Sequence, residues 1–173
     1  MKEKASEGYK ETIISCIREE DLADKPAILI NNVEEGFENY EYLVLQGEKE
    51  AFEQFLTQVM VLNGTADSYA DFYYARLDEN EKEYFHKALS EENRSFLLKG
   101  TWSEGIYYSL DSRLLQFLLE ITANELLFCT FYFTRYACTV WGNYGLQFPV
   151  FFRDGETKER YQKLAEACGL TTE

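Results

Sequence analysis

Four carboxylates around the most apolar part of the sequence are candidates for acid chemistry. They are Glu104, Asp111, Glu120 and Glu125. Paired acids at one end of a sheet can hold Mg²⁺ or share a proton, which would support metal-assisted hydrolysis. Simpler roles compete with this interpretation: Asp111 suits the N-cap of a helix, Glu120 the polar stripe of that helix, and Glu104 a polar loop. We therefore predict no catalytic residues among them.

Histidine and cysteine chemistry has little support in the sequence. The only histidine, His86, lies among charged residues in a predicted helix, as expected for a surface position. Cys138 would need a nearby base to act as a nucleophile, and no other imidazole is present. The cysteines Cys16, Cys129, Cys138 and Cys168 form no CxxC pair, which predicts reduced, core-filling thiols and argues against zinc. No GxGxxG, GxxxxGKS/T, GxSxG or HExxH motif occurs, so we expect no metal and no cofactor.

A group of large amphipathic side chains is the most suggestive recognition feature. Its members are Arg135, Tyr136, Trp141, Asn143 and Tyr144. Tyr, Trp and Arg anchor interfaces and line small binding sites because they combine contact area with hydrogen-bonding groups. We interpret the group as a candidate tip that binds a ligand or partner. The structural alternative is that Trp141 packs against Phe148 in the core.

Negative charge is the strongest compositional signal. The chain carries 31 acids and 17 Lys or Arg, a formal net charge of −14, and residues 1–95 hold −12 of it (22 acids against 10 bases). Such a field repels nucleic-acid backbones and anionic membranes, so we expect neither as a partner. A functional role for the charge would point to a basic protein partner, and an ordinary solubilising surface is the alternative. The candidate partner face consists of Glu48, Glu50, Glu53, Asp67 and Asp71.

Length and apolar content indicate one domain. At 173 residues the chain can bury about 70% of the surface that its unfolded form exposes, so it needs no disulfide for stability. No apolar run approaches the roughly 20 residues of a membrane helix, and the N-terminus lacks a signal-peptide pattern. We predict a single cytoplasmic domain over residues 1–173, with the general appearance of a small bacterial protein.

The segment 125–153 is the region around which we predict the chain to be organised. It holds ten of the 28 aromatic residues, and no acid occurs from 126 to 153. Apolar positions alternate with positions of mixed polarity from 127 to 134, as in a strand that packs one face against the core. Two further runs, 137–141 and 146–152, flank Gly142-Asn143, a dipeptide that suits a two-residue hairpin turn. The pattern predicts a three-stranded antiparallel meander with a central first strand.

Helical periodicity occurs on both sides of the meander, and most of the predicted helices come before it. Apolar spacing near 3.6 residues predicts helices over 5–20, 48–63, 65–77, 78–89, 92–98, 111–124 and 156–168. Short apolar or alternating runs predict strands over 27–30, 40–46 and 106–110. Helices and strands cluster and do not alternate as βαβ units. We therefore predict an α+β fold, with a layer of helices packed on an antiparallel sheet of about four to six strands that includes the C-terminal meander.

The functional prediction is a non-catalytic domain that binds a basic protein, in the manner of an inhibitor, an immunity-type protein or an accessory protein. Concentrated negative charge and missing catalytic motifs support it. One alternative is a small-molecule-binding protein or metal-assisted hydrolase with a pocket between meander and helices, involving Tyr132, Trp141, Asn143 and Glu125. Another is a homo-oligomer, because a strand containing Pro149 could lie at an unprotected sheet edge.

Overall fold

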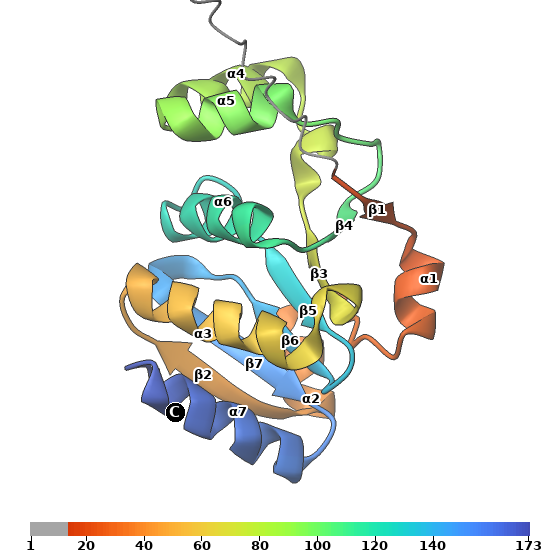
Figure 1. The fold of residues 1–173 in the computed structure, drawn as a ribbon, viewed down its shortest axis with the longest axis vertical. Coiled ribbons are helices and arrows are strands. Elements are labelled where there is room, and N and C mark those ends of the chain that lie inside the picture. Colours follow the sequence, from red (N-terminus) through yellow and green to blue (C-terminus); the bar gives the residue numbers. More distant parts are fainter. Residues whose placement is uncertain (1–13) are drawn as a thin grey trace, which may run out of the picture.

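An antiparallel sheet of eight strands forms the centre of the molecule (Figure 1). The computed structural model describes residues 14–173 and has an α+β fold, as predicted. The strands are β1 (Cys16–Ile17), β2 (Glu41–Gln46), β3 (Ser68–Asp71), β4 (Tyr107–Ser109), β5 (Thr130–Phe133), β6 (Cys138–Trp141), β7 (Gln147–Phe152) and β8 (Thr171–Thr172). Their order across the sheet is β1-β4-β3-β5-β6-β7-β2-β8. The sheet therefore has more strands than the four to six expected.

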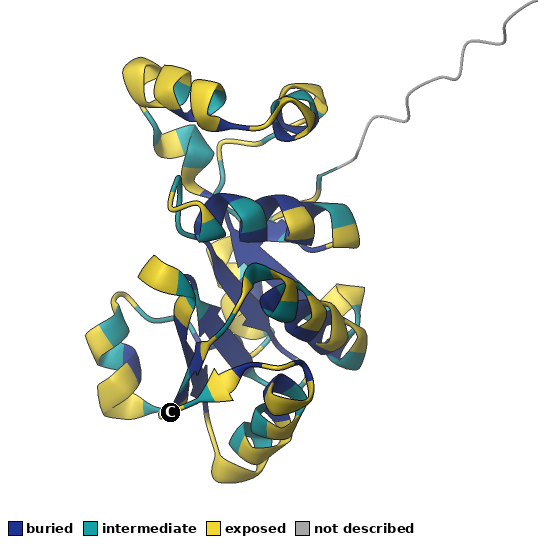
Figure 2. Ribbon diagram, turned by 90° about the vertical axis from the view of Figure 1, so that its left-hand side faces the viewer, coloured by how far each residue is buried: buried dark blue, intermediate teal, exposed yellow. Residues whose placement is uncertain are grey.

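Within residues 14–173 there are seven α-helices, of which five cover the two faces of this sheet and two form a separate pair (Figure 1). The seven helices are α1 (Glu19–Asp24), α2 (Val33–Asn39), α3 (Lys49–Asn63), α4 (Glu79–Ala88), α5 (Glu91–Lys99), α6 (Ser112–Ala123) and α7 (Gly155–Ala167). Helices α3, α6 and α7 pack on one face, and α1 and α2 lie on the other. The inner strands β3, β5, β6 and β7 are almost entirely buried, whereas the outer strands are more exposed (Figure 2).

Local capping signals set the starts of three helices. Asp78 and Glu81 form a reciprocal capping box, in which each side chain accepts the backbone N–H of the other residue at 2.8 Å. Ser90 caps α5, and Asp111 caps α6 by accepting a backbone N–H at 2.8 Å. These starts agree with the prediction because a capping bond requires only neighbours along the chain.

The aromatic segment forms the predicted meander of β5, β6 and β7 near the middle of the sheet. Residues 142–146 connect β6 to β7 and include the 3₁₀ helix η3 (Tyr144–Leu146), so the predicted two-residue turn at Gly142-Asn143 is wrong. Gly142 is needed for a different reason. A Cβ at this position would lie 2.3 Å from the carbonyl oxygen of Cys129, so only glycine allows the two backbones to approach this closely.

Pro149 lies inside the sheet, so the predicted unprotected edge at this proline is wrong. Strand β7 pairs with β6 on one side and with β2 on the other. Pro149 lies opposite Val44, whose N–H and C=O both bond to Glu173 on the far side of β2. The proline therefore occupies a non-hydrogen-bonded position of the β2–β7 ladder, and pairing with β6 stops at Val150. The actual edges of the sheet are the two-residue strands β1 and β8.

Two predictions near the N-terminus also differ from the structure. Residues 5–13 of the predicted first helix lie outside the described residues, and residues 16–17 form β1 instead of continuing a helix. The segment 27–30, predicted as a strand, is irregular, and the polar stretch after it forms α2. Asn32 caps this helix by accepting the N–H of Glu35 at 2.9 Å.

The helix predicted over 65–77 is replaced by β3 between two 3₁₀ helices, η1 (Thr65–Asp67) and η2 (Tyr73–Arg76). Within β3, Tyr69 faces the α1 side of the sheet and Ala70 faces the main core. Pairing with β4 and β5 on both sides overrides the helical spacing, because it satisfies the backbone and buries both faces of the strand.

An aromatic cluster joins the α4–α5 pair to the rest of the molecule. The ring centroid of Phe72 lies 4.9 Å from that of Trp102 and 5.6 Å from that of Phe117 on α6. Phe96 on α5 lies 5.1 Å from Phe117. These contacts hold α5 beside α6, so polar side chains on the two helices can meet.

Candidate functional site

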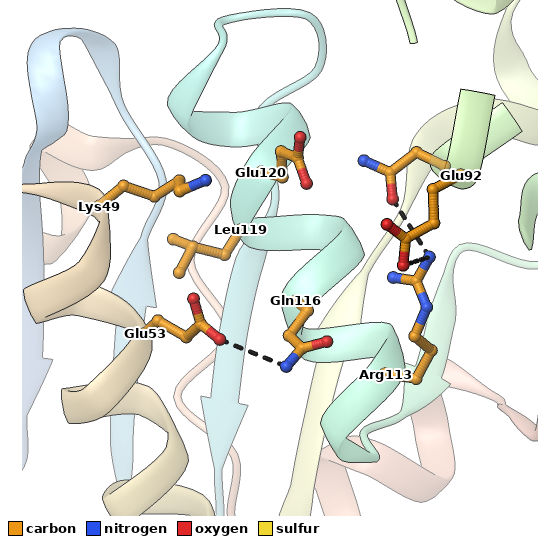
Figure 3. Close-up of a pocket in the computed structure, with 8 residues that line it drawn as sticks. Lys49, Glu53, Glu92, Arg113, Gln116, Leu119 and Glu120 are labelled. Carbon is orange, nitrogen blue, oxygen red and sulfur yellow. Dashed lines mark hydrogen bonds and ion pairs between the residues drawn. The ribbon is translucent and has the colours of Figure 1, made fainter. Parts of the chain in front are cut away.

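A polar pocket of about 260 Å³ lies where α3, α5 and α6 approach one another (Figure 3). Its lining residues are Lys49 and Glu53 from α3, Glu92 and Asn93 from α5, and Arg113, Gln116, Leu119 and Glu120 from α6. We name it the interhelical pocket. Three helices that are distant in sequence therefore place charged and amide side chains around one site.

Hydrogen bonds hold both sides of the interhelical pocket. Gln116 Nε2 donates to Glu53 Oε1 at 3.3 Å and so links α6 to α3. On the other side, Arg113 Nη2 donates to Asn93 Oδ1 at 3.2 Å and lies 3.8 Å from Glu92 Oε1. The dashed lines in Figure 3 mark these interactions. The pocket is therefore preorganised by contacts between its own walls.

Arg113 is the most firmly held charge of the pocket. Its guanidinium carbon lies 4.3 Å from the ring centroid of Phe96, a cation–π contact that fixes the side chain against α5. Asn93 is buried, so its hydrogen bond to Arg113 also gives a partner to an amide oxygen that no longer bonds to water. Arg113 is thus engaged with the protein itself.

Carboxylates outnumber cations at this site. Glu53, Glu92 and Glu120 line the pocket together with Lys49 and Arg113. Glu120 has no ion pair within 4.0 Å among the residues from 14 to 173. An adjoining groove of about 440 Å³ continues along α3 and is lined by Glu50, Glu53, Gln54, Thr57 and Gln58. The site has an excess of negative charge and offers hydrogen-bond acceptors to a cationic group.

Two of the five residues of the predicted acidic face line the pocket or the adjoining groove, and a third precedes them in sequence. Glu48 and Glu50 are exposed at the start of α3, and Glu53 lines the pocket. Asp67 lies beyond the other end of α3, with its Oδ1 3.8 Å from Lys25 Nζ. The acidic face is therefore smaller than predicted and is centred on the first half of α3.

Asp71 is buried in the sheet, which corrects its assignment to the acidic face. It is 4% exposed, and its carboxylate accepts the N–H of Thr130 at 2.7 Å and the hydroxyl of Tyr132 at 3.1 Å. Burial raises the pKa of Asp71 from 3.8 to about 7, and the two hydrogen bonds oppose this change. The side chain joins β3 to β5 from within the sheet. No local pattern over residues 68–71 indicated this strand, because its partners come from β4 and β5.

The predicted recognition tip is divided between the two ends of β6. Arg135 and Tyr136 lie in the turn between β5 and β6, whereas Trp141 ends β6, and Asn143 and Tyr144 follow it. A strand of this length spans about 13 Å, so the two groups form separate sites. Trp141 and Asn143 are half-buried, and Tyr144 is exposed.

The candidate nucleophile and base belong to different parts of the fold. Cys138 is fully buried in β6, and burial raises the pKa of its thiol well above the usual range. His86 lies on α4, where its Nε2 is 2.6 Å from the hydroxyl oxygen of Tyr74. A thiol held in its neutral form and an imidazole bonded elsewhere do not form a nucleophile–base pair.

The four acids considered for acid chemistry do not meet. Asp111 caps α6, Glu120 lines the interhelical pocket, and Glu104 is exposed in the loop before β4. Glu125 Oε1 accepts the N–H of Gly145 at 2.9 Å. Among residues 14–173, no three His, Cys, Asp or Glu side chains lie close enough together to hold a metal ion.

The pocket proposed between meander and helices involves different residues from those found here. Tyr132, Trp141, Asn143 and Glu125 do not line the interhelical pocket. Tyr132 is buried on the α1 side of the sheet, where its hydroxyl bonds to Asp71.

Sequence reasoning named Glu53 and Glu120 but missed Lys49, Glu92 and Arg113. These residues occur in three separate predicted helices, and nothing in the local pattern of one helix indicates which others lie beside it. The one local signal was Asn93, a short amide at a position that the periodicity of α5 turns inward. A buried amide needs a polar partner, which predicts a polar contact but not its identity.

Comparison of the chain with known protein families, with curated protein sequences and with solved structures finds no match. Each helix within residues 14–173 is too short or too polar to cross a membrane.

Proposed function

We propose that this protein is a non-catalytic protein-binding domain that holds a basic partner at the interhelical pocket, as an inhibitor, immunity-type or accessory protein would. The observation that carries the proposal is the convergence of Glu53, Glu92 and Glu120 from three helices on one pocket. This pocket lies in a chain with a net charge of −14. A cationic side chain of the partner enters the pocket and donates hydrogen bonds to these carboxylates.

The size of the pocket favours a single side chain over a free ligand. Pockets for small molecules have volumes of about 300–1,000 Å³ and are mostly apolar. The interhelical pocket has a volume of about 260 Å³, and Leu119 is the only apolar side chain among residues 14–173 that lines it. A lysine or arginine projecting from a protein surface would fill it while the rest of the partner contacts the exposed acids Glu48 and Glu50.

Charge also gives this interaction a characteristic dependence on salt. Exposed acids around the pocket raise the association rate of a basic partner, and added salt screens this attraction. Acids that make direct contact with the inserted side chain set the dissociation rate of the complex. The proposal therefore predicts a complex that forms more slowly at high ionic strength.

Neutralising the pocket tests the proposal. Tagged full-length chain is used to capture partners from a lysate of the source cells at low salt, and captured proteins are identified by mass spectrometry. We expect the triple variant Glu53→Gln, Glu92→Gln, Glu120→Gln to retain at least tenfold less of a basic partner, because loss of about 1.4 kcal/mol lowers affinity tenfold.

A matched variant provides the control for total charge. Asp24, Glu34 and Glu38 are exposed acids on α1 and α2, on the other face of the sheet. The variant Asp24→Asn, Glu34→Gln, Glu38→Gln removes the same charge and should leave capture of the partner nearly intact. Equal loss in both variants would show that only net charge matters, and unchanged capture by the pocket variant would refute a role for the pocket.

A further inference from the structure

A second surface lies between α7 and the last turns of α3, at the end of α3 that is far from the interhelical pocket. It is an open groove of about 730 Å³, which we name the α3–α7 groove. Its lining residues are Gln58, Val61, Leu62, Arg160, Lys163, Leu164 and Ala167. In a chain with 31 acids and 17 Lys or Arg, this lining contains two bases and no acid. The groove thus differs from its surroundings in both polarity and charge.

The groove has apolar side chains that are exposed to solvent. Val61 is 77% exposed, although valine is a weaker helix former than the polar residues common on helix surfaces. Leu62 and Leu164 on the two walls are half-buried, so part of each side chain remains open to the groove. Contiguous exposed apolar surface with a polar rim is typical of protein-interaction sites.

The basic rim of the groove is held in place by aromatic contacts. The guanidinium carbon of Arg160 lies 4.5 Å from the ring centroid of Tyr136, and that of Arg135 lies 5.8 Å from the same ring. Neither arginine has an ion pair within 4.0 Å among residues 14–173. Their N–H groups therefore remain available to an external carboxylate. Lys163 pairs with Glu159 at 2.9 Å, but both side chains are exposed, so this pair is weak.

Tyr136 is itself fixed by the core beneath the groove. Its backbone N–H donates to Asn63 Oδ1 at 2.9 Å, and its carbonyl accepts the hydroxyl of Tyr161 at 2.7 Å. Asn63 Nδ2 also donates to the Tyr161 hydroxyl at 2.8 Å. The last turn of α3, the β5–β6 turn and α7 are thus joined by buried hydrogen bonds. Such a network makes the groove a preformed surface.

We propose that the α3–α7 groove binds an amphipathic helix of a partner protein, with apolar residues in the groove and acidic residues against Arg160 and Lys163. Two neighbouring helices form a channel that suits a third helix, whose anchors recur at i, i+3 or i+4 and i+7. The charge of the rim selects an acidic partner. A second copy of this chain docked groove to groove would place the same bases against each other, which disfavours that occupant. This surface lies apart from the interhelical pocket and does not depend on its proposed function.

Fluorescence anisotropy with a defined peptide tests this inference. The probe is a fluorescein-labelled peptide of about 18 residues, long enough to form a helix, with Leu at the anchor positions and Glu elsewhere. Its counterpart has Gln in place of each Glu. We expect the Glu peptide to bind the full chain at least threefold more tightly than the Gln peptide, despite the net charge of −14 that repels it.

Variants then locate the binding. Val61→Gln and Arg160→Gln should each weaken binding of the Glu peptide by about threefold to tenfold, and the double variant by more. Leu98→Gln is the matched control, because Leu98 is another exposed apolar helix residue, on α5. It should bind the peptide as the unmodified chain does. The pocket variant Glu53→Gln should also bind normally, which separates this test from that of the interhelical pocket.

Three outcomes would overturn the inference. Equal affinity for the Glu and Gln peptides would remove the role of the basic rim. Unchanged binding by the Val61 and Arg160 double variant, with an unchanged thermal midpoint, would place the peptide elsewhere. Light scattering that shows a dimer of the free chain, abolished by Val61→Gln, would identify a second copy as the occupant.

Discussion

Helix α3 contributes to both candidate surfaces, and its two halves lie in different surroundings. Its first half carries Lys49 and Glu53 into the interhelical pocket, where α6 and α5 supply hydrogen bonds and charges of both signs. Its last turns carry Val61 and Leu62 into the α3–α7 groove, where the lining is apolar and the charges are basic. A pocket of partly paired charges selects the sign of its partner, whereas an apolar groove selects shape and contact area.

The two surfaces also differ in how they are anchored. In the pocket, Gln116 and Arg113 make side-chain bonds that remain partly accessible to water. In the groove, the buried Asn63 connects three elements through hydrogen bonds inside the core. The groove therefore depends on the folding core, whereas the pocket depends on its own rim. Four predictions test this difference, from the largest expected effect to the smallest.

Removing the buried amide should have the largest effect. Asn63→Ala leaves the N–H of Tyr136 without its partner inside the core and deletes two further hydrogen bonds. We expect the free energy of unfolding to fall by about 3–4 kcal/mol, because each buried unsatisfied group costs about 1–3 kcal/mol. Urea denaturation measures this change. Asn80→Ala, at an exposed position on α4, should have almost no effect. A loss below 1 kcal/mol for Asn63→Ala would contradict the anchored groove.

The buried acid should make stability fall with rising pH. The pKa of Asp71 is raised from 3.8 to about 7 in the folded state, so the folded chain retains a proton that the unfolded chain releases. The stability that this proton provides is complete below about pH 4 and is lost as the pH rises to about 7. The loss between pH 5 and pH 8 is on the order of 3 kcal/mol, because about two pKa units of the change lie above pH 5 and each is worth about 1.4 kcal/mol.

Asp71→Asn isolates this effect. The amide oxygen still accepts the N–H of Thr130, and the amide has no proton to release. Unfolding of the variant by urea at pH 5 and at pH 8 should give more similar stabilities than unfolding of the unmodified chain. The same pH dependence in both proteins would show that another group is responsible.

Breaking the pocket rim should have a smaller effect than breaking the core. Arg113→Met keeps most of the contact with Phe96 but leaves the buried Asn93 Oδ1 without its donor. We expect a loss of about 1 kcal/mol, since water can partly replace the arginine. The thermal midpoint and urea curve measure it, with Arg76→Met, at an exposed position, as the control. A loss as large as that of Asn63→Ala would contradict the proposed difference between the two surfaces.

Changes to the contact residues themselves should affect stability least. Val61→Gln and Glu53→Gln should alter the free energy of unfolding by no more than about 0.5 kcal/mol, because both side chains reach solvent. Val59→Gln, at a fully buried position of the same helix, should cost several-fold more. Urea curves of the three variants provide the comparison. A large loss for Val61→Gln would mean that this residue serves the fold and not a partner.

Much of the fold was predictable where the signals are local. The meander over 125–153, the helix over 48–63 and the helix starts at Asp78 and Asp111 follow from side-chain alternation, helical spacing and capping. The strand β3 was not predictable in this way, because its residues also fit a helical stripe and only β4 and β5 give them their partners. The role of Gly142 likewise depends on the backbone of Cys129, which reaches it through pairing of β5 with β6.

The same distinction between local signals and tertiary contacts applies to the candidate sites. The sequence by itself determined the net charge, the excess of acids before residue 96, and the presence of Glu53, Glu120, Arg135 and Tyr136. Tertiary structure decided which of these residues share a surface. In the folded chain Asp71 is buried in the sheet. Glu92 shares a pocket with Glu53 and Glu120, and Val61 shares a groove with Arg160. The physical reason is that charge and periodicity are properties of short segments, whereas a site consists of distances between segments, which only the packing of the core sets.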